Sequence, residues 1–208
     1  MTGVAIDIEC DGIKSKWNQI IFPSGCHMDP ESRMWCISFT YGVPSGISTQ
    51  TLACKLPPTT RPLPFTGSDG RQWYTKSYHE ESTVIPATSA IVDNNYESYL
   101  GKVEKCISHF ANKNVPIFFR GYYDGKQHYD YDKLMLDNIF TQHNIPTSAL
   151  SGCYNLNRYY NYKWEETSKQ NKVWGCPNQQ FLEMGLKHNK EDSEQLYKHV
   201  QEFLNDKQ

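Results

Sequence analysis

Residues 4–12 read VAIDIECDG, an apolar run that carries acidic residues inside it. The apolar positions are too closely spaced for a surface strand and are typical of a strand buried on both faces. Asp7 and Glu9 are two positions apart, so both side chains point to the same face of that strand. Like charges held this close in a poorly solvated place raise each other's pKa unless a cation neutralises them. The pair predicts a divalent-cation site with oxygen ligands, and the plainer interpretation is an edge strand with two solvated acids.

Length and composition favour one globular domain. The chain has 208 residues, enough to bury a sizeable core, and residues 1–208 are expected to form a single domain with an irregular, Pro- and Gly-marked insertion at 55–90. Apolar residues make up only 38%, but 14 Tyr, 9 Phe and 5 Trp argue against disorder. The net charge of −2 gives no overall basic field, so any contact with nucleic acid must be local.

Cysteine usage and the distribution of apolar residues indicate an intracellular protein, cytoplasmic or nuclear, without a membrane partner. The 7 cysteines form no C-x-x-C pair, which favours reduced thiols. The N-terminal residues lack the charged and apolar regions of a signal peptide, and no apolar run is long enough to span a bilayer. A structural zinc site is a weaker alternative, with ligands from Cys26, His27 and Cys36 or from Cys153 and Cys176.

The apolar pattern predicts three strands followed by alternating helices and strands. Predicted strands are residues 4–12, 34–41, 47–52, 115–119 and a short one beginning at 149. Predicted helices are residues 96–113, 132–143, 178–186 and 192–204. The first three strands are expected to form an antiparallel meander. This order favours an α/β fold with a mixed sheet flanked by helices, and residues 155–174 carry no clear assignment.

Acids recur at the start of two predicted helices. Asp130 and Asp132 open the helix at 132–143, and Asp192 opens the last one, with His188 four residues before it. An acid in the first turn of a helix stabilises the positive end of the helix dipole, which is the plainer interpretation of each of them. If His188 and Asp192 are both helical, their spacing places them on one helix face.

Taken together, these motifs resemble those of the DEDD superfamily of 3′–5′ exonucleases, and the histidine resembles its DEDDh branch. The resemblance covers residues 4 to about 204 and implies a ribonuclease H-like fold. The first motif is the most specific, because Gly12 stands three residues after Glu9 as in the family. It implies that Gly12 and Ile13 contact the terminal nucleotide.

In divergent members from viruses and mobile elements, a basic residue and a glycine end the strand that precedes the second motif. Arg120 and Gly121 occupy that place, so Arg120 is also expected to bind substrate.

The second motif leaves two candidates for the family's next carboxylate. Asp132 is favoured because His128 stands four residues before it and Leu136 four after it. Asp130 also has a leucine, Leu134, four residues later, so the choice between the two acids stays open.

The third motif departs from the branch pattern. Only three residues separate His188 from Asp192, whereas DEDDh enzymes usually have four, and the shorter spacing is typical of the branch that uses tyrosine. The departure affects the expected role of His188 as general base more than the expected role of Asp192 as a cation ligand.

The resemblance implies a two-metal-ion hydrolysis of DNA or RNA from the 3′ end to nucleoside 5′-monophosphates. Two Mg²⁺ or Mn²⁺ ions about 3.5–4 Å apart would be held by carboxylates. Asp7 would bridge both ions, Glu9 and Asp192 would hold the one on the nucleophile side, and Asp132 the other. His188 would take the proton of the attacking water, since histidine titrates near neutral pH.

Two alternatives to an exonuclease stay open. One is a catalytically silent ribonuclease H-like module that binds nucleic acid or a protein partner. The other is a nuclease of the same fold that cuts internally. The sequence does not indicate an oligomeric state.

Overall fold

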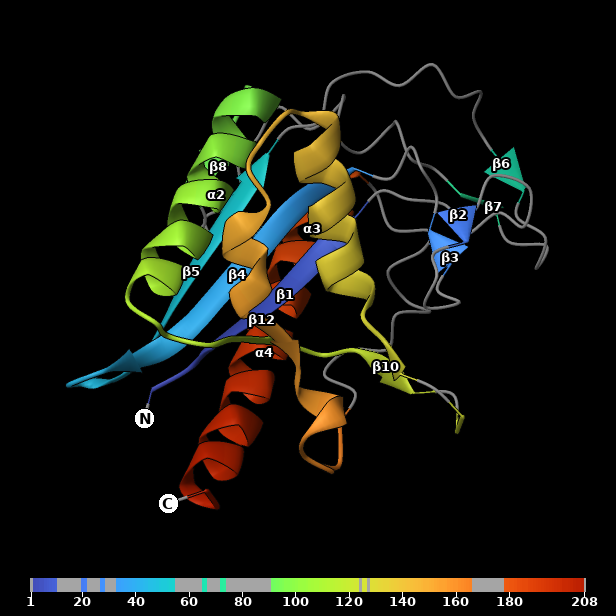
Figure 1. Ribbon diagram of the computed structural model, residues 1–208. Helices are drawn as coiled ribbons and strands as arrows, with labels where there is room; N and C mark the ends of the chain where they lie inside the picture. The colour runs from blue at the N-terminus through green and yellow to red at the C-terminus, as the bar shows by residue number, and fades with distance from the viewer. Residues whose placement is uncertain are drawn as a thin grey trace.

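The computed structural model describes residues 2–10, 20–21, 27–28, 33–54, 65–66, 72–73, 91–123, 125–126, 128–165 and 178–207. Within these ranges the chain is an α/β structure with a six-stranded mixed sheet between helices (Figure 1). Gly12, Ile13 and most of the predicted insertion at 55–90 lie outside the described residues. So do Cys26 and Cys176 of the zinc alternative.

The sheet has the order β12-β9-β1-β4-β5-β8, which places the first strand near its centre. β1 (Val4–Cys10), β4 (Met34–Val43) and β5 (Gly46–Cys54) pair antiparallel, so the predicted meander is confirmed. β9 (Ile117–Phe119) runs parallel to β1, and β12 (Cys153–Asn155) runs parallel to β9. At the other edge β8 (Ile91–Asp93) pairs parallel with β5.

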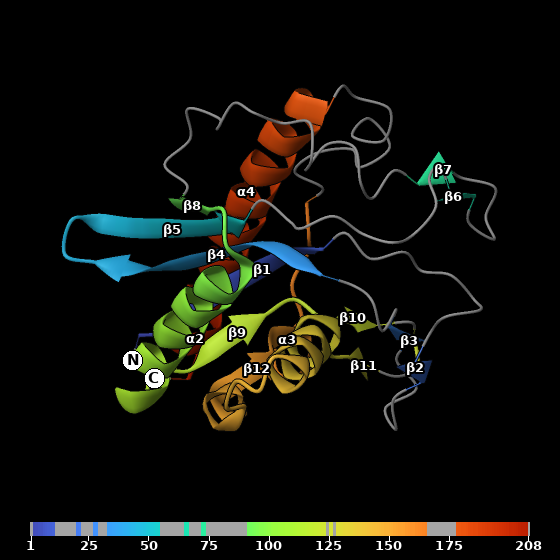
Figure 2. The same cartoon turned by 90° about the horizontal axis from the view of Figure 1, so that it is seen from above.

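Helices cover both faces of the sheet. α2 (Tyr96–Asn112) and α3 (Tyr131–Gln142) lie on one face, close to the predicted bounds, and α4 (Asn178–Asn205) crosses the other (Figure 2). β1 serves both layers by alternation: Val4 and Ile6 enter the core beneath α2 and α3, whereas Ala5 packs against α4. Asp7 and Glu9 share the parity of Ala5, which places them on the face that α4 covers.

Asparagines mark the helix ends. Asn95 caps α2 by accepting a hydrogen bond from the Ser98 N–H at 2.8 Å. Asn114 and Asn144 follow α2 and α3 with φ values of 53° and 55°, the left-handed conformation that ends many helices.

The structure differs from the elements predicted from the sequence at three places. The two helices predicted at 178–186 and 192–204 are one continuous helix, so Asp192 is not a first-turn acid. The strand predicted from Ala149 is instead the 3₁₀ helix η1 (Ser148–Gly152), and the strand β12 begins only at Cys153. β8 carried no prediction.

Several short elements complete the described chain. They are β2 (Ile20–Ile21) with β3 (His27–Met28), β6 (Phe65–Thr66) with β7 (Gln72–Trp73), β10 (Tyr122–Tyr123) with β11 (His128–Tyr129), and the 3₁₀ helix η2 (Leu156–Arg158). None of the helices in the described ranges combines the length and the apolar character needed to cross a membrane.

Candidate active site

The site begins at the carboxyl end of β1, where Asp7 and Glu9 face α4. Asp7 lies opposite Ser38 of β4 in the sheet register, and Glu9 lies opposite Cys36. A register shift between Glu9 and Cys10 ends the regular pairing there. Irregularities of this kind can change the direction of side chains at the end of a strand, and this one lies directly after Glu9.

α4 is fixed over the sheet by close contacts along its length. Near its beginning, Gly185 lies so close to Trp35 that a Cβ would stand 2.8 Å from the Trp35 ring. In the middle, the hydroxyl groups of Thr40 and Ser193 are 2.7 Å apart and buried. Towards the end, apolar side chains that include Val200 pack in a cluster with Ala5. These contacts set which turn of α4 faces the acidic pair.

That turn brings His188, Asn189 and Asp192 against β1. The Nε2 atom of His188 is 3.5 Å from Oδ2 of Asp192 and 3.9 Å from Oε1 of Glu9. Asn189 donates from Nδ2 to Oδ2 of Asp7 at 2.8 Å. His188 and Asp192 are each 8% exposed. The four-residue spacing therefore does place His188 and Asp192 on one helix face, as a helical arrangement requires.

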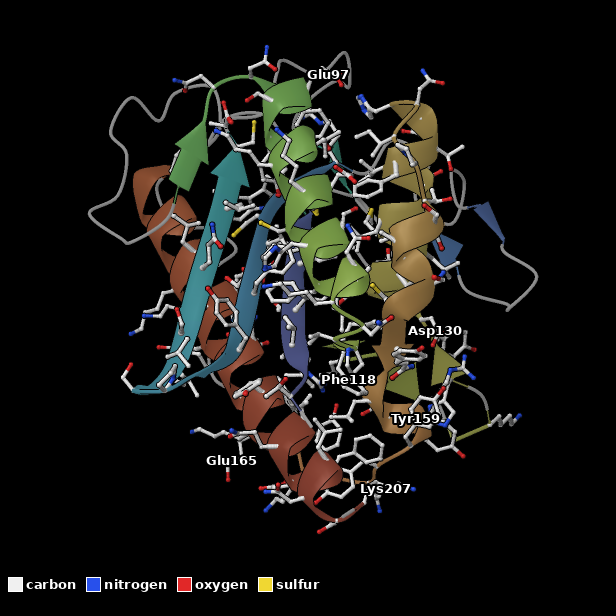
Figure 3. All side chains as sticks on the ribbon, turned by 60° about the vertical axis from the view of Figure 1, so that its left-hand side comes forward. Glu97, Phe118, Asp130, Tyr159, Glu165 and Lys207 are labelled. Atoms are coloured by element: carbon white, nitrogen blue, oxygen red, sulfur yellow. The ribbon has the colours of Figure 1, made fainter. Side chains whose placement is uncertain are left out.

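α3, which packs on the sheet face opposite α4, contributes Asp132 from its first turn. The charge of Asp132 raises the pKa of both Asp7 and Glu9, so the three carboxylates face a shared region. Asp130, in contrast, is engaged elsewhere: Arg158 donates to it from Nε at 3.0 Å and from Nη2 at 2.8 Å, and Asn155 donates at 2.8 Å. Figure 3 shows Asp130 near Tyr159, where α3 begins.

Burial and neighbouring charges raise the pKa values of the carboxylates at this site. Burial raises the pKa of Asp7 well above its ordinary value, and the charges of Glu9, Asp132 and Asp192 raise it further. The hydrogen bond from Asn189 acts in the opposite direction. Burial, followed by the charges of Asp192 and Asp132, raises the pKa of Glu9 to about 8. Within the described residues, the raised pKa values of Asp7 and Glu9 show that these acids are not fully compensated by positive charge.

Arg120 borders the cluster from the end of β9. Burial raises the pKa of Asp132 to about 7, and the Arg120 charge opposes that rise. The guanidinium lies 4.1 Å above the ring of Trp164, which holds it by a cation–π contact. The predicted substrate-binding arginine thus stands beside the acids, whereas the other two predicted contacts, Gly12 and Ile13, lie outside the described residues.

Sequence patterns did not identify two buried amides at this site, Asn189 and Asn155. Asn189 is fully buried between Asp7 and Cys36, and Asn155 is 2% exposed behind the first turn of α3. The available signal for Asn189 was its place between His188 and Asp192. An asparagine in a polar run of a helix does not stand out without knowledge of which turn faces the sheet.

The carboxylates of Asp7, Glu9, Asp132 and Asp192 supply the oxygen ligands that Mg²⁺ and similar divalent cations prefer. Among the residues that the structure describes, no group of three or more His, Cys, Asp or Glu side chains is arranged so that it could hold a metal ion. Mg²⁺ commonly takes one or two carboxylates together with water and phosphate oxygens, so a closed protein cage is not required. Burial and the repulsion between neighbouring carboxylates both raise the pKa values of Asp7 and Glu9, and a bound cation would offset both effects.

No protein-family model matches the chain, and no curated protein sequence matches it. A functional assignment therefore depends on the chemistry of this site.

Proposed function

We propose that the chain is a metal-dependent 3′–5′ exonuclease that hydrolyses DNA or RNA. The observation that carries the proposal is the gathering of Asp7 and Glu9 from β1, Asp132 from α3 and Asp192 from α4, with His188 3.9 Å from Glu9 and 3.5 Å from Asp192. Buried acids that raise one another's pKa are costly to fold, and such groups concentrate at functional sites.

The architecture is compatible with the ribonuclease H-like fold that this proposal requires. β1 is central, an antiparallel meander lies to one side of it, and parallel strands lie to the other. α4 brings the third acidic motif across the sheet from the far end of the chain. This arrangement supports a nuclease of the DEDD type because it unites all three sequence motifs at one end of β1.

Asp7, Glu9, Asp132 and Asp192 would hold the cations, for which we propose two Mg²⁺ or Mn²⁺ ions. When bound, these ions supply electrostatic stabilisation of the charge that develops on the attacked phosphate and on the leaving oxygen. Arg120 binds a phosphate of the substrate strand, since its guanidinium is already oriented by Trp164.

His188 accepts the proton of the attacking water in this mechanism. Carboxylate oxygens of Glu9 and Asp192 lie 3.9 and 3.5 Å from its Nε2 atom, so this ring nitrogen is held next to the proposed cation ligands. General-base assistance of this kind contributes about 10²–10⁴-fold to a rate. The three residues between His188 and Asp192 place both side chains on one helix face.

The test is digestion of a single-stranded oligonucleotide labelled at its 5′ end, with Mn²⁺ and with EDTA. We expect a ladder of products shortened from the 3′ end, which EDTA abolishes. Asp132→Asn should lower the rate by at least about 100-fold, because a cation ligand supplies several kcal/mol in the transition state.

Asp130→Asn is the matched control, since it alters a carboxyl group two residues away that is bound to Arg158. We expect this variant to keep most of its activity, because the amide oxygen at position 130 can still accept the hydrogen bonds from Asn155 and Arg158. Equal losses in Asp130→Asn and Asp132→Asn, with both variants folded, would contradict the assignment of Asp132. A circular single strand should resist digestion, and its cleavage would indicate a nuclease that cuts internally. Binding of the oligonucleotide without any digestion would favour a catalytically silent module.

A further inference from the structure

Asn189 is a buried amide beside the acidic cluster, and it belongs to none of the acidic motifs. It is fully buried in the middle of α4, and its side chain is hydrogen-bonded to one residue of β1 and one of β4. The Nδ2 atom donates to Oδ2 of Asp7 at 2.8 Å, and the Oδ1 atom accepts a hydrogen bond from Sγ of Cys36 at 3.3 Å. Both ends of the amide are therefore engaged, one by the acid and one by the thiol.

Cys36 determines which end of the amide faces Asp7. A thiol hydrogen directed at Oδ1 favours the orientation in which the NH₂ group points to β1. The reverse orientation would place the carbonyl oxygen of Asn189 against the carboxylate of Asp7, which is repulsive. Cys36 stands opposite Glu9 in the sheet register, so backbone pairing fixes the position from which its thiol reaches Asn189.

The hydrogen bond from Asn189 restricts how Asp7 can present its oxygens. A carboxylate has about four lone-pair sites, and the amide uses one of them on Oδ2. Among the residues that the structure describes, Asn189 is the side chain that donates to Asp7, which leaves Oδ1 to accept a cation. Outer partners that hold a ligand in this way commonly account for about 10- to 100-fold in metal affinity.

We propose that Asn189 is a positioning residue that orients the Asp7 carboxylate for cation binding, and that Cys36 in turn orients Asn189. The inference rests on the proposed function, since it needs a cation at Asp7. The two hydrogen bonds that link Cys36 to Asn189 and Asn189 to Asp7 would then contribute to the affinity for the cation, separately from any contribution to the stability of the fold.

The test measures Mn²⁺ affinity by electron paramagnetic resonance in the absence of nucleic acid. Asn189→Leu, which keeps the side-chain shape and removes both hydrogen bonds, should bind Mn²⁺ about 10- to 100-fold more weakly than the wild type. Cys36→Ala should weaken binding in the same direction but by less, and Cys36→Ser, which keeps a donor, should restore it. Thr51→Val is the matched control, because it removes a buried hydroxyl that lies 2.8 Å from Ser38 within the sheet and makes no contact used to place α4, and it should leave Mn²⁺ affinity unchanged.

Unchanged Mn²⁺ affinity in folded Asn189→Leu overturns this inference alone, whereas absence of Mn²⁺ binding by the wild type overturns it together with the proposed function. A second measurement does not depend on folding of the variant. In ¹⁵N spectra of the wild type, the side-chain NH₂ signals of Asn189 should shift when Mg²⁺ is added. Signals that do not respond to saturating Mg²⁺ would also overturn the inference.

Discussion

At the scale of single residues, Asn155 fixes the place where β9 ends and α3 begins. Its Oδ1 atom accepts hydrogen bonds from the N–H groups of Gly121 at 3.1 Å and Asn157 at 3.0 Å, while its Nδ2 atom donates to Asp130. Since Asp130 precedes α3, these bonds connect the end of the sheet to the helix that carries Asp132. The side chain is 2% exposed, so loss of these bonds would leave buried polar atoms unpaired.

Gly121→Ala is expected to destabilise the protein. A Cβ at this position would overlap the Asn155 amide and stand 2.6 Å from the backbone oxygen of Tyr129. Overpacking of this kind costs about 1–3 kcal/mol, which urea denaturation would measure as a lower free energy of unfolding.

Gly101→Ala in α2 is the control for that substitution, because a Cβ there meets no described atom within 4 Å. It should raise the free energy of unfolding by about 0.5–1 kcal/mol, since alanine is the better helix former. Wild-type stability in Gly121→Ala would contradict the packing described around Asn155.

The sequence could predict individual acids, but it could not predict which of them would be engaged by other side chains. Alternation along a strand was enough to place Asp7 and Glu9 on one face, because that geometry is local. The choice between Asp130 and Asp132 depended on Arg158, whose ion pair with Asp130 spans a long sequence separation. Long-range pairs of this kind leave no periodic signal.

At the scale of elements, α4 shows why the predicted and observed helices differ. Residues 187–192 are polar and interrupt the apolar periodicity, so the pattern predicted two helices. The structure shows that this turn is polar because it faces the acidic pair, with His188 and Asn189 buried there. The interruption in the apolar pattern therefore marks the candidate site, and the helix continues through it.

Short strands were the other elements that the sequence did not predict correctly. β8 and β12 each contain three residues, too few for an alternation to be distinguished from chance. The predicted strand at Ala149 failed because Leu150 is buried through a 3₁₀ turn, where apolar residues need no alternation. The longer elements β1, β4, β5, α2 and α3 had enough residues for their periodicity to predict them.

At the scale of the whole molecule, the acidic cluster is expected to make metal-free stability depend on pH. The folded-state pKa is raised to about 8 for Glu9 and to about 7 for Asp132, from ordinary values of 4.5 and 3.8. Between these limits the folded chain binds more protons than the unfolded chain, so this contribution to stability rises as the pH falls from about 8 towards about 4.

In EDTA we therefore expect the free energy of unfolding in urea to be higher at pH 5 than at pH 8, by at least about 1 kcal/mol. Asp132→Asn should reduce this difference because it removes one of the repelling acids. Added Mn²⁺ should raise stability more at pH 8 than at pH 5, since protons and the cation compete for the same oxygens. A metal-free protein that is less stable at pH 5 than at pH 8 would contradict the electrostatic picture of the cluster.

The central claim is that Asp7, Glu9, Asp132 and Asp192 share bound cations, and anomalous diffraction from crystals soaked in Mn²⁺ tests it most directly. The account predicts two anomalous peaks about 3.5–4 Å apart at the carboxyl end of β1, with oxygens of Asp7 coordinating both. Crystals that show no peak at this cluster, or peaks that Asp132 and Asp192 do not approach, would contradict it.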